Sequence, residues 1–162
     1  EPDGTVTPGN AATMHDGAAI VVMVSGEVLK SLGKVPAVAV VGTASCGATA
    51  GEEATASIAA FLKLKARING AMPDRLGLVE LNEGSAAEAI AFRDSLGIGE
   101  EALNPDGGAL ARGYPFAAGS AVGAVRVFSR LVRGKEPVKH DVGIAVSGGL
   151  GGVGTAVALQ RV

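Results

Sequence analysis

The chain of 162 residues has few aromatic residues and almost no cysteine. Aromatic residues make up 3% of it and Trp is absent, so its core must be built mainly from Ala, Val, Leu and Ile. Cys46 is the only cysteine, which excludes an intramolecular disulfide and fits a reducing compartment. The histidines, His15 and His140, lie far apart without the spacing of metal ligands, so no metal site is predicted.

An excess of charge of one sign and long apolar runs are also missing. The net charge is −2 and basic residues do not cluster, so we predict no nucleic-acid partner. The continuous apolar run at 18–24 is far too short to span a membrane, and residues 1–4 lack the basic start and apolar stretch of a signal peptide. These absences predict a soluble, cytoplasmic protein with no membrane partner.

The chain does have 25 glycines and 48% hydrophobic residues, enough for one domain over residues 1–162. Apolar runs predict five strands, at 18–24, 35–41, 76–81, 142–146 and 154–159. Helical spacing and capping residues predict four helices, at 26–32, 52–69, 85–96 and 120–132. The small residues at 43–50 predict a loop. This order indicates an α/β fold, a mixed five-stranded sheet with helices on both faces.

Four motifs occur in the order found in the thiolases. They are GTVTPGN (4–10) with DGAA (16–19), LVELNE (78–83), GGALARGYPFAAG (107–119) and GIAVSGGLGGVG (143–154). The chain therefore resembles the C-terminal half of the thiolase superfamily, which includes acetyl-CoA acetyltransferase and 3-ketoacyl-CoA thiolase. The resemblance implies a thiolase-like half-fold with α-β-α layers. It implies no bound cofactor, with a CoA thioester as the possible substrate.

The resemblance also implies a partner. A thiolase has two similar halves, and the N-terminal half carries the nucleophilic cysteine. This chain would need such an N-terminal half or a second subunit, in a homo- or hetero-oligomer. Two copies of this chain pairing without catalysis are a further possibility.

Thiolase chemistry requires a cysteine nucleophile, a histidine base, a second cysteine as acid and base, and donors for developing oxyanions. The family's C-terminal half supplies the histidine, the second cysteine and one oxyanion asparagine. Asn82 matches the asparagine; the alternative is a strand-end Asn that caps the next helix. Tyr114 stands in the histidine position. A phenol, with a pKa of about 10 against about 6.5 for imidazole, is no efficient base near neutral pH. Tyr114 either donates one hydrogen bond to the oxyanion or only fills the cavity.

The remaining family positions are also substituted. Gly148 stands where the family has its second cysteine and supplies neither acid nor base. Ser147 is adjacent, but strand alternation points it to the opposite face. Ala12 stands where many thiolases have a serine that contacts the pantetheine of CoA, and His15 where they often have Asn. Cys46 aligns with neither family cysteine and has no base near it in the sequence.

The residues therefore predict the C-terminal half or small subunit of a thiolase-like acyl-CoA acyltransferase with a degenerate active site. The alternative is a non-catalytic structural or interaction subunit that pairs with a like half-fold. The two differ in whether Asn82 still serves a reaction whose nucleophile lies on another chain.

Overall fold

The computed structural model describes residues 4–68, 70, 72, 76–134 and 141–162. Within these residues, four strands form one sheet in the order β1-β4-β3-β2. The strands are β1 (Val38–Gly47), β2 (Val79–Asn82), β3 (Val142–Gly149) and β4 (Val153–Arg161). β2 runs parallel to β3, whereas β4 is antiparallel to both β1 and β3. The sheet is therefore mixed, with β1 and β2 at its edges.

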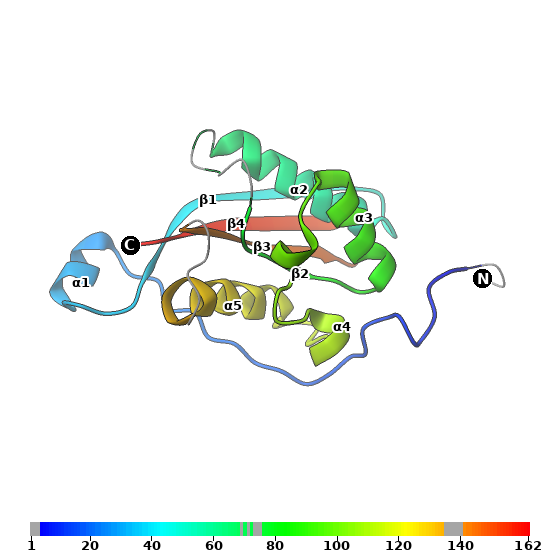
Figure 1. Ribbon diagram of the computed structural model, residues 1–162, viewed down its shortest axis with the longest axis horizontal. Helices are drawn as coiled ribbons and strands as arrows, with labels where there is room; N and C mark the ends of the chain where they lie inside the picture. The colour runs from blue at the N-terminus through cyan, green and yellow to red at the C-terminus, as the bar shows by residue number, and fades with distance from the viewer. Residues whose placement is uncertain (1–3, 69, 71, 73–75, 135–140) are drawn as a thin grey trace.

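Helices cover both faces of the sheet (Figure 1). α2 (Glu53–Arg67) and α3 (Ala86–Leu96) lie on one face, and α5 (Gly119–Arg133) lies on the other. The shorter elements are α1 (Gly26–Ser31), the 3-10 helix η1 (Glu100–Ala102) and α4 (Ala109–Arg112). This arrangement confirms the predicted α/β class with α-β-α layers. In the described part of the chain, no helix has the length and apolar character needed to cross a membrane.

Each face of the sheet has its own apolar core. On the α2–α3 face, the rings of Phe61 and Phe92 meet edge to face with centroids 5.7 Å apart. On the α5 face, Val127 and Leu131 pack against Leu78. β3 is buried along nearly its whole length, as expected of a central strand with helices on both sides. The core thus uses two phenylalanines and many aliphatic side chains, in line with the composition.

The prediction of a five-stranded sheet is wrong, because residues 18–24 form no strand in the structure. Ile20 and Val22 are 85% and 80% exposed. An apolar run indicates that a segment must be buried, but it does not say which strand it will pair with. The other four predicted strands are present, with β1 and β2 shifted towards the C-terminal side of their predicted ranges.

The predicted loop at 43–50 is mostly strand, since β1 continues to Gly47. Ala44 is buried, pairs with Ala156 of β4 and lies in the core beneath α2. The small side chains here allow close packing of helix on sheet, whereas the sequence pattern alone predicted a loop.

The four predicted helices are present to within a few residues, and the predicted Ser25 cap is observed. Ser25 Oγ accepts a hydrogen bond from Val28 N at 3.3 Å and begins α1. Ser85 Oγ accepts from Glu88 N at 3.2 Å and begins α3. Gly97, with φ of 63°, ends α3 in the left-handed conformation. The Ser25 cap was therefore predicted from the sequence, whereas the Ser85 cap was found only in the structure.

Candidate active site

Asn104 holds the long loop after η1 to the free edge of β2. Its side-chain Oδ1 accepts a hydrogen bond from Leu81 N at 2.7 Å, and its Nδ2 donates to Leu81 O at 3.1 Å. Its backbone N donates to Val79 O at 2.8 Å. The carboxamide thus takes the place of a neighbouring strand. Asn104 has φ of 47°, a left-handed conformation that Asn adopts more readily than most residues.

Glu83 extends this contact into the loop that carries α4. Glu83 is 2% exposed. Its Oε2 accepts from Asn104 Nδ2 at 2.9 Å, and its Oε1 accepts from Leu110 N at 3.2 Å. Gly108 lies directly against this carboxylate, because a Cβ there would overlap Glu83 Oε1. The start of α4 is therefore fixed over the end of β2 by one buried carboxylate.

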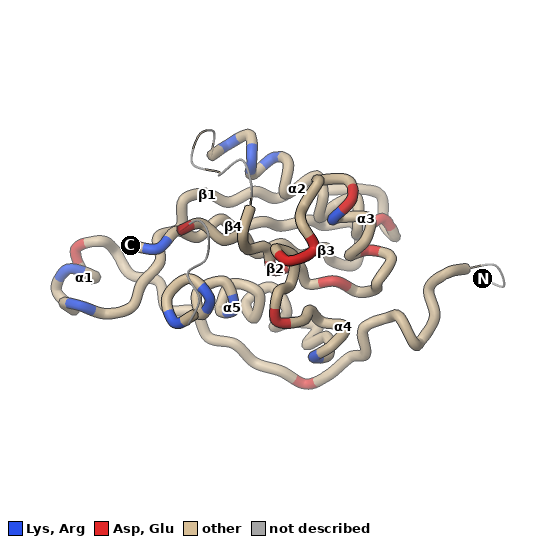
Figure 2. Tube along the Cα trace, in the orientation of Figure 1, with Lys and Arg blue, Asp and Glu red and all other residues tan. Residues whose placement is uncertain are grey.

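A cluster of ionic side chains around the buried Glu80 joins the same loop to α5. Glu80 Oε2 lies 2.7 Å from Arg126 Nε and 3.8 Å from the Arg112 guanidinium. Gly107 O accepts from Arg112 Nε at 2.9 Å and from Arg126 Nη2 at 3.3 Å. A second acid, Asp106, lies 3.8 Å from Arg126. Figure 2 shows basic positions along α5 and acidic positions on the chain beside it.

Burial raises the pKa of the Glu80 carboxyl, and the hydrogen bond and charge of Arg126 only partly oppose this effect. The geometry agrees, since Glu80 Oε1 is buried without a hydrogen-bond partner among the described residues. Glu80 is thus an acid whose charged form costs free energy where it lies.

Asn82 ends β2 and has its carboxamide confined by two neighbours. Its Nδ2 donates to Ser147 Oγ at 3.5 Å, and Ser147 Oγ donates in turn to Gly148 O at 3.1 Å. Gly119, at the start of α5, lies so close that a Cβ there would collide with the carboxamide. The cap of α3 is Ser85, so Asn82 does not have that role. The amide is therefore held in place by β3 and by α5.

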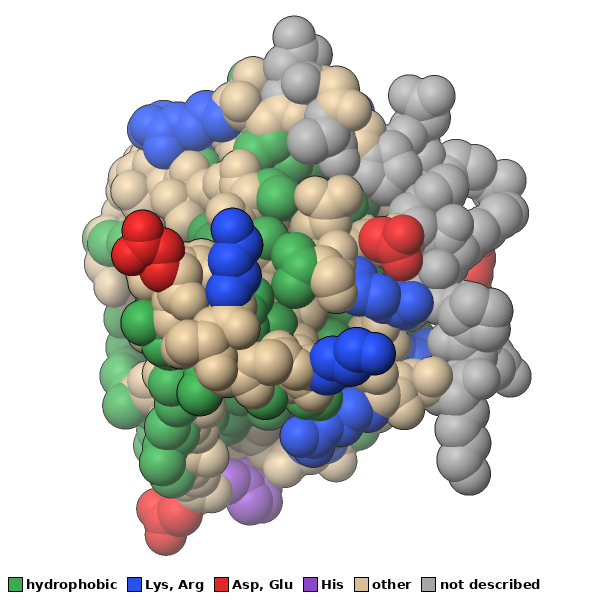
Figure 3. All heavy atoms as spheres, turned by 90° about the vertical axis from the view of Figure 1, so that its left-hand side faces the viewer, with side chains coloured by type: hydrophobic (Ala, Val, Ile, Leu, Met, Phe, Trp, Pro, Cys, Tyr) green, Lys and Arg blue, Asp and Glu red, His purple; other side chains and the backbone are tan. Residues whose placement is uncertain are grey.

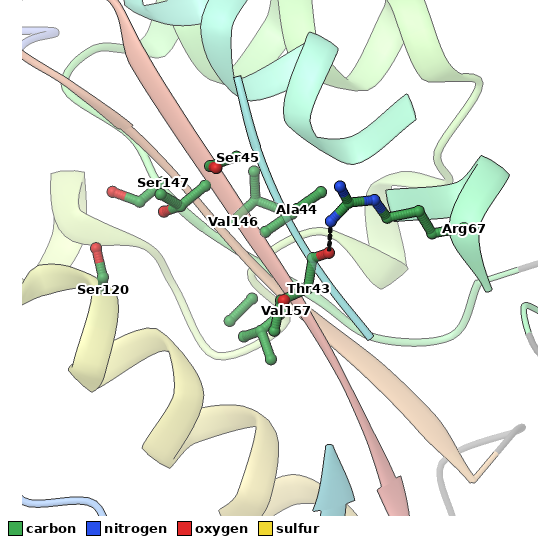
Figure 4. A pocket seen from close by; sticks show the side chains of 11 residues that line it. Thr43, Ala44, Ser45, Arg67, Ser120, Val146, Ser147 and Val157 are labelled. Atoms are coloured by element: carbon green, nitrogen blue, oxygen red, sulfur yellow. Dashed lines mark hydrogen bonds between the residues drawn. The ribbon is translucent and has the colours of Figure 1, made fainter. Parts of the chain in front are cut away.

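Asn82 belongs to a row of polar residues that crosses all four strands. The register pairs Ser45 with Thr155, Thr155 with Ser147, and Ser147 with Asn82. Three of these residues, with Ser120 of α5, line a cavity of about 360 Å³ on the α5 face (Figure 4). Arg67 of α2 also lines the cavity, and its Nη1 donates to Thr43 O at 2.8 Å. The other lining residues are Thr43, Ala44, Ala145, Val146, Ala156 and Val157. Its walls offer hydroxyl groups next to the Asn82 position.

The segment at 10–15 brings Ala12 and Tyr114 to the same end of the sheet. Ala12 N donates to Gly84 O at 2.9 Å, beside the end of β2. Tyr114 N donates to Thr13 O at 2.8 Å, and Tyr114 O accepts from His15 N at 3.1 Å. The segment thus joins the Asn82 loop to the loop that carries Tyr114. The Tyr114 ring is half-buried, with its centroid 6.2 Å from that of Phe116.

His15 lies on the other side of this ribbon from the Tyr114 side chain. Met14 pairs with Tyr114, so alternation places the His15 side chain on the side of Gly113. A Cβ at Gly113 would collide with the His15 ring. His15 Nδ1 lies 2.8 Å from Thr13 O, and since a carbonyl only accepts, Nδ1 carries the proton. His15 therefore packs on the glycine, on the side of the ribbon away from the Tyr114 ring.

Gly148 lies in a different row of the sheet from Ser147. Gly148 pairs with Gly154, which pairs with Cys46 of β1. Ser147 belongs to the polar row on the α5 face, as strand alternation predicts. Cys46 is half-buried against the core beneath α2. His140 lies outside the described residues. Among the residues that the structure describes, no group of His, Cys, Asp or Glu could hold a metal ion.

Sequence reasoning did not find the roles of Asn104, Glu80 and Arg126. The only local signal for Asn104 is the Asn-Pro-Asp-Gly turn at 104–107, which indicates a turn but not the strand edge that it contacts. Glu80 and Arg126 are 46 positions apart, so their pairing depends on the packing of α5 against β2.

Comparisons with known proteins agree with this fold over nearly the whole chain. The family model described as "Thiolase, C-terminal domain" matches residues 29–161. A beta-ketoadipyl-CoA thiolase of Pseudomonas putida is 34% identical over 163 residues, covering 99% of this chain and 40% of the relative. An acetyl-CoA acetyltransferase of Allochromatium vinosum is 35% identical over 159 residues, covering 98% and 39%. This chain therefore spans about 40% of the length of these relatives.

Solved structures give the same result. The crystal structure of the Bacillus anthracis acetyl-CoA acetyltransferase has a TM-score of 0.89 and 28% identity, covering 99% of this chain and 39% of that one. The Acat5 thiolase of Ascaris suum in complex with coenzyme A has a TM-score of 0.83 and 27% identity, covering 98% and 40%.

Replacing Asn104 tests the contact with the β2 edge. Asn104→Gly keeps the backbone conformation and leaves Leu81 N and Glu83 short of partners, which should lower the free energy of unfolding by about 1–3 kcal/mol. Asn104→Ala should lower it by about 1–2 kcal/mol more, because Ala is disfavoured at positive φ. Urea unfolding measures both. Asn10→Gly, at an exposed turn, is the control; a loss equal to that of Asn104→Gly would contradict the assignment.

Replacing Glu80 tests its buried environment. Because its pKa is raised in the folded chain, folding favours the protonated acid. The stability of the wild type relative to Glu80→Gln should be greatest below the ordinary pKa of 4.5 and should be lost as pH rises through the raised value. Urea unfolding of both proteins at stepped pH measures the difference. A wild-type advantage that grows with pH would show instead that the charged pair with Arg126 dominates.

Proposed function

Because this chain belongs to the thiolase family, as its C-terminal domain, we propose that it is the C-terminal half or small subunit of a thiolase-like acyl-CoA acyltransferase. The nucleophilic cysteine would lie in an N-terminal half or partner chain. The length comparison supports this, since the relatives contain about two and a half times as much chain. The substrate would be a CoA thioester, in keeping with the printed names of the relatives.

The observation that carries the proposal is the fixed carboxamide of Asn82. An oxyanion donor works when it is held in place before the charge develops. Gly119 and Ser147 confine this amide at the end of β2, where the family resemblance expects the oxyanion asparagine. The cavity beside it is open to a group presented by another chain.

The remaining positions support a degenerate site. Tyr114 can donate one hydrogen bond but is no efficient base near neutral pH. Gly148 has no acid, and Ala12 has no hydroxyl to bind pantetheine. Losing a general base typically costs about 10²- to 10⁴-fold in rate. Acyl transfer from a thioester would therefore survive at a low rate, whereas Claisen condensation, which needs a proton removed from carbon, would not.

The alternative is a non-catalytic subunit that pairs with a like half-fold. Three substituted positions, Ala12, Tyr114 and Gly148, favour it, while the loop that carries Tyr114 keeps its support from Glu83 and Asn104. In that case the scaffold is retained for assembly, and Asn82 has only a packing role against Gly119.

The two functions differ in the effect of Asn82→Ala on the complete assembly. If Asn82 stabilises an oxyanion, its removal should lower kcat/KM for acyl transfer from acetyl-CoA by about 10²- to 10³-fold. Gln160→Ala, which removes an exposed carboxamide on β4, should leave the rate unchanged. Absence of acyl transfer in the wild-type assembly, or an unchanged rate in Asn82→Ala, would favour the non-catalytic subunit.

Restoring the family histidine tests whether one substitution explains the loss. Tyr114→His alone should not bring thiolysis of acetoacetyl-CoA to a detectable rate, because Gly148 still offers no acid or base to the carbon nucleophile. The assay follows loss of acetoacetyl-CoA in the complete protein. Recovery of thiolysis by this single change would refute the assignment of Gly148 as a lost catalytic position.

A further inference from the structure

The two carboxyl oxygens of Glu80 lie in different surroundings. Oε2 lies 2.7 Å from Arg126 Nε and 3.8 Å from Arg112 Nη2. Oε1 is buried and has no hydrogen-bond partner among the described residues. A proton can therefore bind at Oε1 without breaking a hydrogen bond, while Oε2 continues to accept from Arg126. Protonation would remove the negative charge that both arginines face and would leave the Glu80 side chain in place.

Both arginines have a second contact, and it is the same one. Arg112 Nε and Arg126 Nη2 donate to Gly107 O, in the loop before α4. A guanidinium can hold two acceptors at once because its donors point in fixed, different directions. The two guanidinium groups thus connect the carboxylate of Glu80 with a backbone carbonyl of the loop. The attachment of Gly107 therefore depends on the charge that the arginines meet at Glu80.

Glu80 also contacts the helix that confines Asn82. The two residues are two positions apart on β2, so their side chains lie on the same face of the strand. On α5, Gly119 lies against Asn82, and Arg126, about two turns later, contacts Glu80. The contact of α5 with β2 is therefore neutral at Asn82 and charged at Glu80.

The charged groups around Glu80 come from two helices and a loop. Arg126 of α5 and Arg112 of α4 favour its charged form, whereas Asp106 of the loop opposes it. The side chains of Arg126 and Arg112 are only 20% and 32% exposed. Water therefore screens them less than the Lys and Arg side chains that reach the surface at the end of the molecule viewed in Figure 3. On the neighbouring strand, Ala145 pairs with Glu80 and brings no charge.

The proton on Glu80 and the attachment of the loop are linked. Burial raises the pKa of the Glu80 carboxyl, and the nearby arginines lower it in part. If the loop and its arginine contacts were detached, the pKa of Glu80 would be higher still. Loss of the proton therefore strengthens the attachment of the loop, and uptake of the proton weakens it.

We propose that Glu80 is a proton-sensitive positioning residue for the candidate site. In its charged form, Glu80 holds Arg112 and Arg126 against Gly107 O and so fixes the loop that leads through α4 to Tyr114. When Glu80 takes up a proton, the arginines lose the charge that they share and the loop detaches more readily from α5. The movement of the loop does not depend on the proposed function, whereas its effect on acyl transfer does.

The movement would be local. Asn104 still holds the start of the loop to β2, and Glu83 still accepts from Leu110 N at the start of α4. These contacts do not involve Glu80. The part of the loop that responds to the proton is therefore the stretch around Gly107 and the short helix that follows it.

Hydrogen exchange at stepped pH on the complete assembly, this chain together with the remaining part of the protein, tests the proposal. The amides of Ala111, Arg112 and Gly113 close the turns of α4, and their protection is expressed relative to an unstructured peptide at the same pH. In the wild type it should fall about tenfold as pH drops through the raised pKa of Glu80. In Glu80→Gln it should stay low at every pH. The amides of β3, which should not change, show that the fold is intact.

Two variants separate Glu80 from the other acids. Glu27→Gln, at an exposed acid of α1, should keep the transition of the wild type. Asp106→Asn should also keep it, at a lower pH, because Asp106 raises the pKa of Glu80. A transition that persists in Glu80→Gln, or one that disappears in Asp106→Asn, would overturn the inference.

Arg126→Lys tests the double contact of the guanidinium. Lysine keeps a charge beside Glu80 but lacks the fork that also reaches Gly107 O. Protection of α4 should therefore be about tenfold lower than in the wild type above the pKa of Glu80, and it should no longer change with pH. Arg133→Lys, at an exposed arginine of the same helix, is the matched control. Equal protection in the two variants would refute the role of Arg126.

The same samples separate this inference from the proposed function. Acyl transfer from acetyl-CoA is measured at each pH beside the hydrogen exchange. A loop that responds to pH without any acyl transfer would keep this inference and remove the proposed activity. Acyl transfer with a loop that does not respond to pH would do the reverse.

Discussion

The carboxamide of Asn104 closes the free edge of β2, and the candidate site is positioned through that edge. β2 has only four residues and pairs with β3 on one side, so its other side would be an open row of hydrogen-bonding groups. Asn104 satisfies both backbone groups of Leu81 and passes the contact on to Glu83. Glu83 in turn accepts from Leu110 N at the start of α4. The Glu83 side chain therefore connects the end of β2 to the loop that carries Tyr114.

The ion cluster gives this loop a second attachment, of a different kind. The buried Glu80 pairs with the partly buried Arg126, and such pairs add little net stability because desolvation opposes their attraction. The cluster instead positions the loop. Arg112 and Arg126 both donate to Gly107 O, and Arg126 thereby holds the loop against α5. The loop is therefore held to the end of β2 by Asn104 and Glu83, and to α5 by Arg126.

Two features of the chain remain incomplete within its own fold. Ser45, Thr155 and Ser147 of the polar row line an open cavity on the α5 face, and the apolar segment at 18–24 has no pairing strand among the described residues. Segment 10–15 connects these features to Tyr114, because it forms hydrogen bonds both to the backbone of Tyr114 and to Gly84 in the loop that follows Asn82. A half-fold that keeps its internal supports while leaving these surfaces open has the properties expected of one part of a larger assembly.

The sequence by itself determined the helices with the Ser25 cap, the α/β class, and the family motifs from which Asn82, Tyr114, Gly148 and Ala12 are predicted as site positions. These depend on local chemistry: capping, periodicity and residue type at fixed spacing. Only the tertiary structure decided that residues 18–24 stay outside the sheet and that 43–47 belong to it. It alone also revealed Asn104 on β2 and Glu80 with Arg126. The physical reason is that strand pairing and charge pairs join residues far apart in the chain. An apolar or polar pattern indicates that a segment needs a partner, but it does not indicate which segment that partner is.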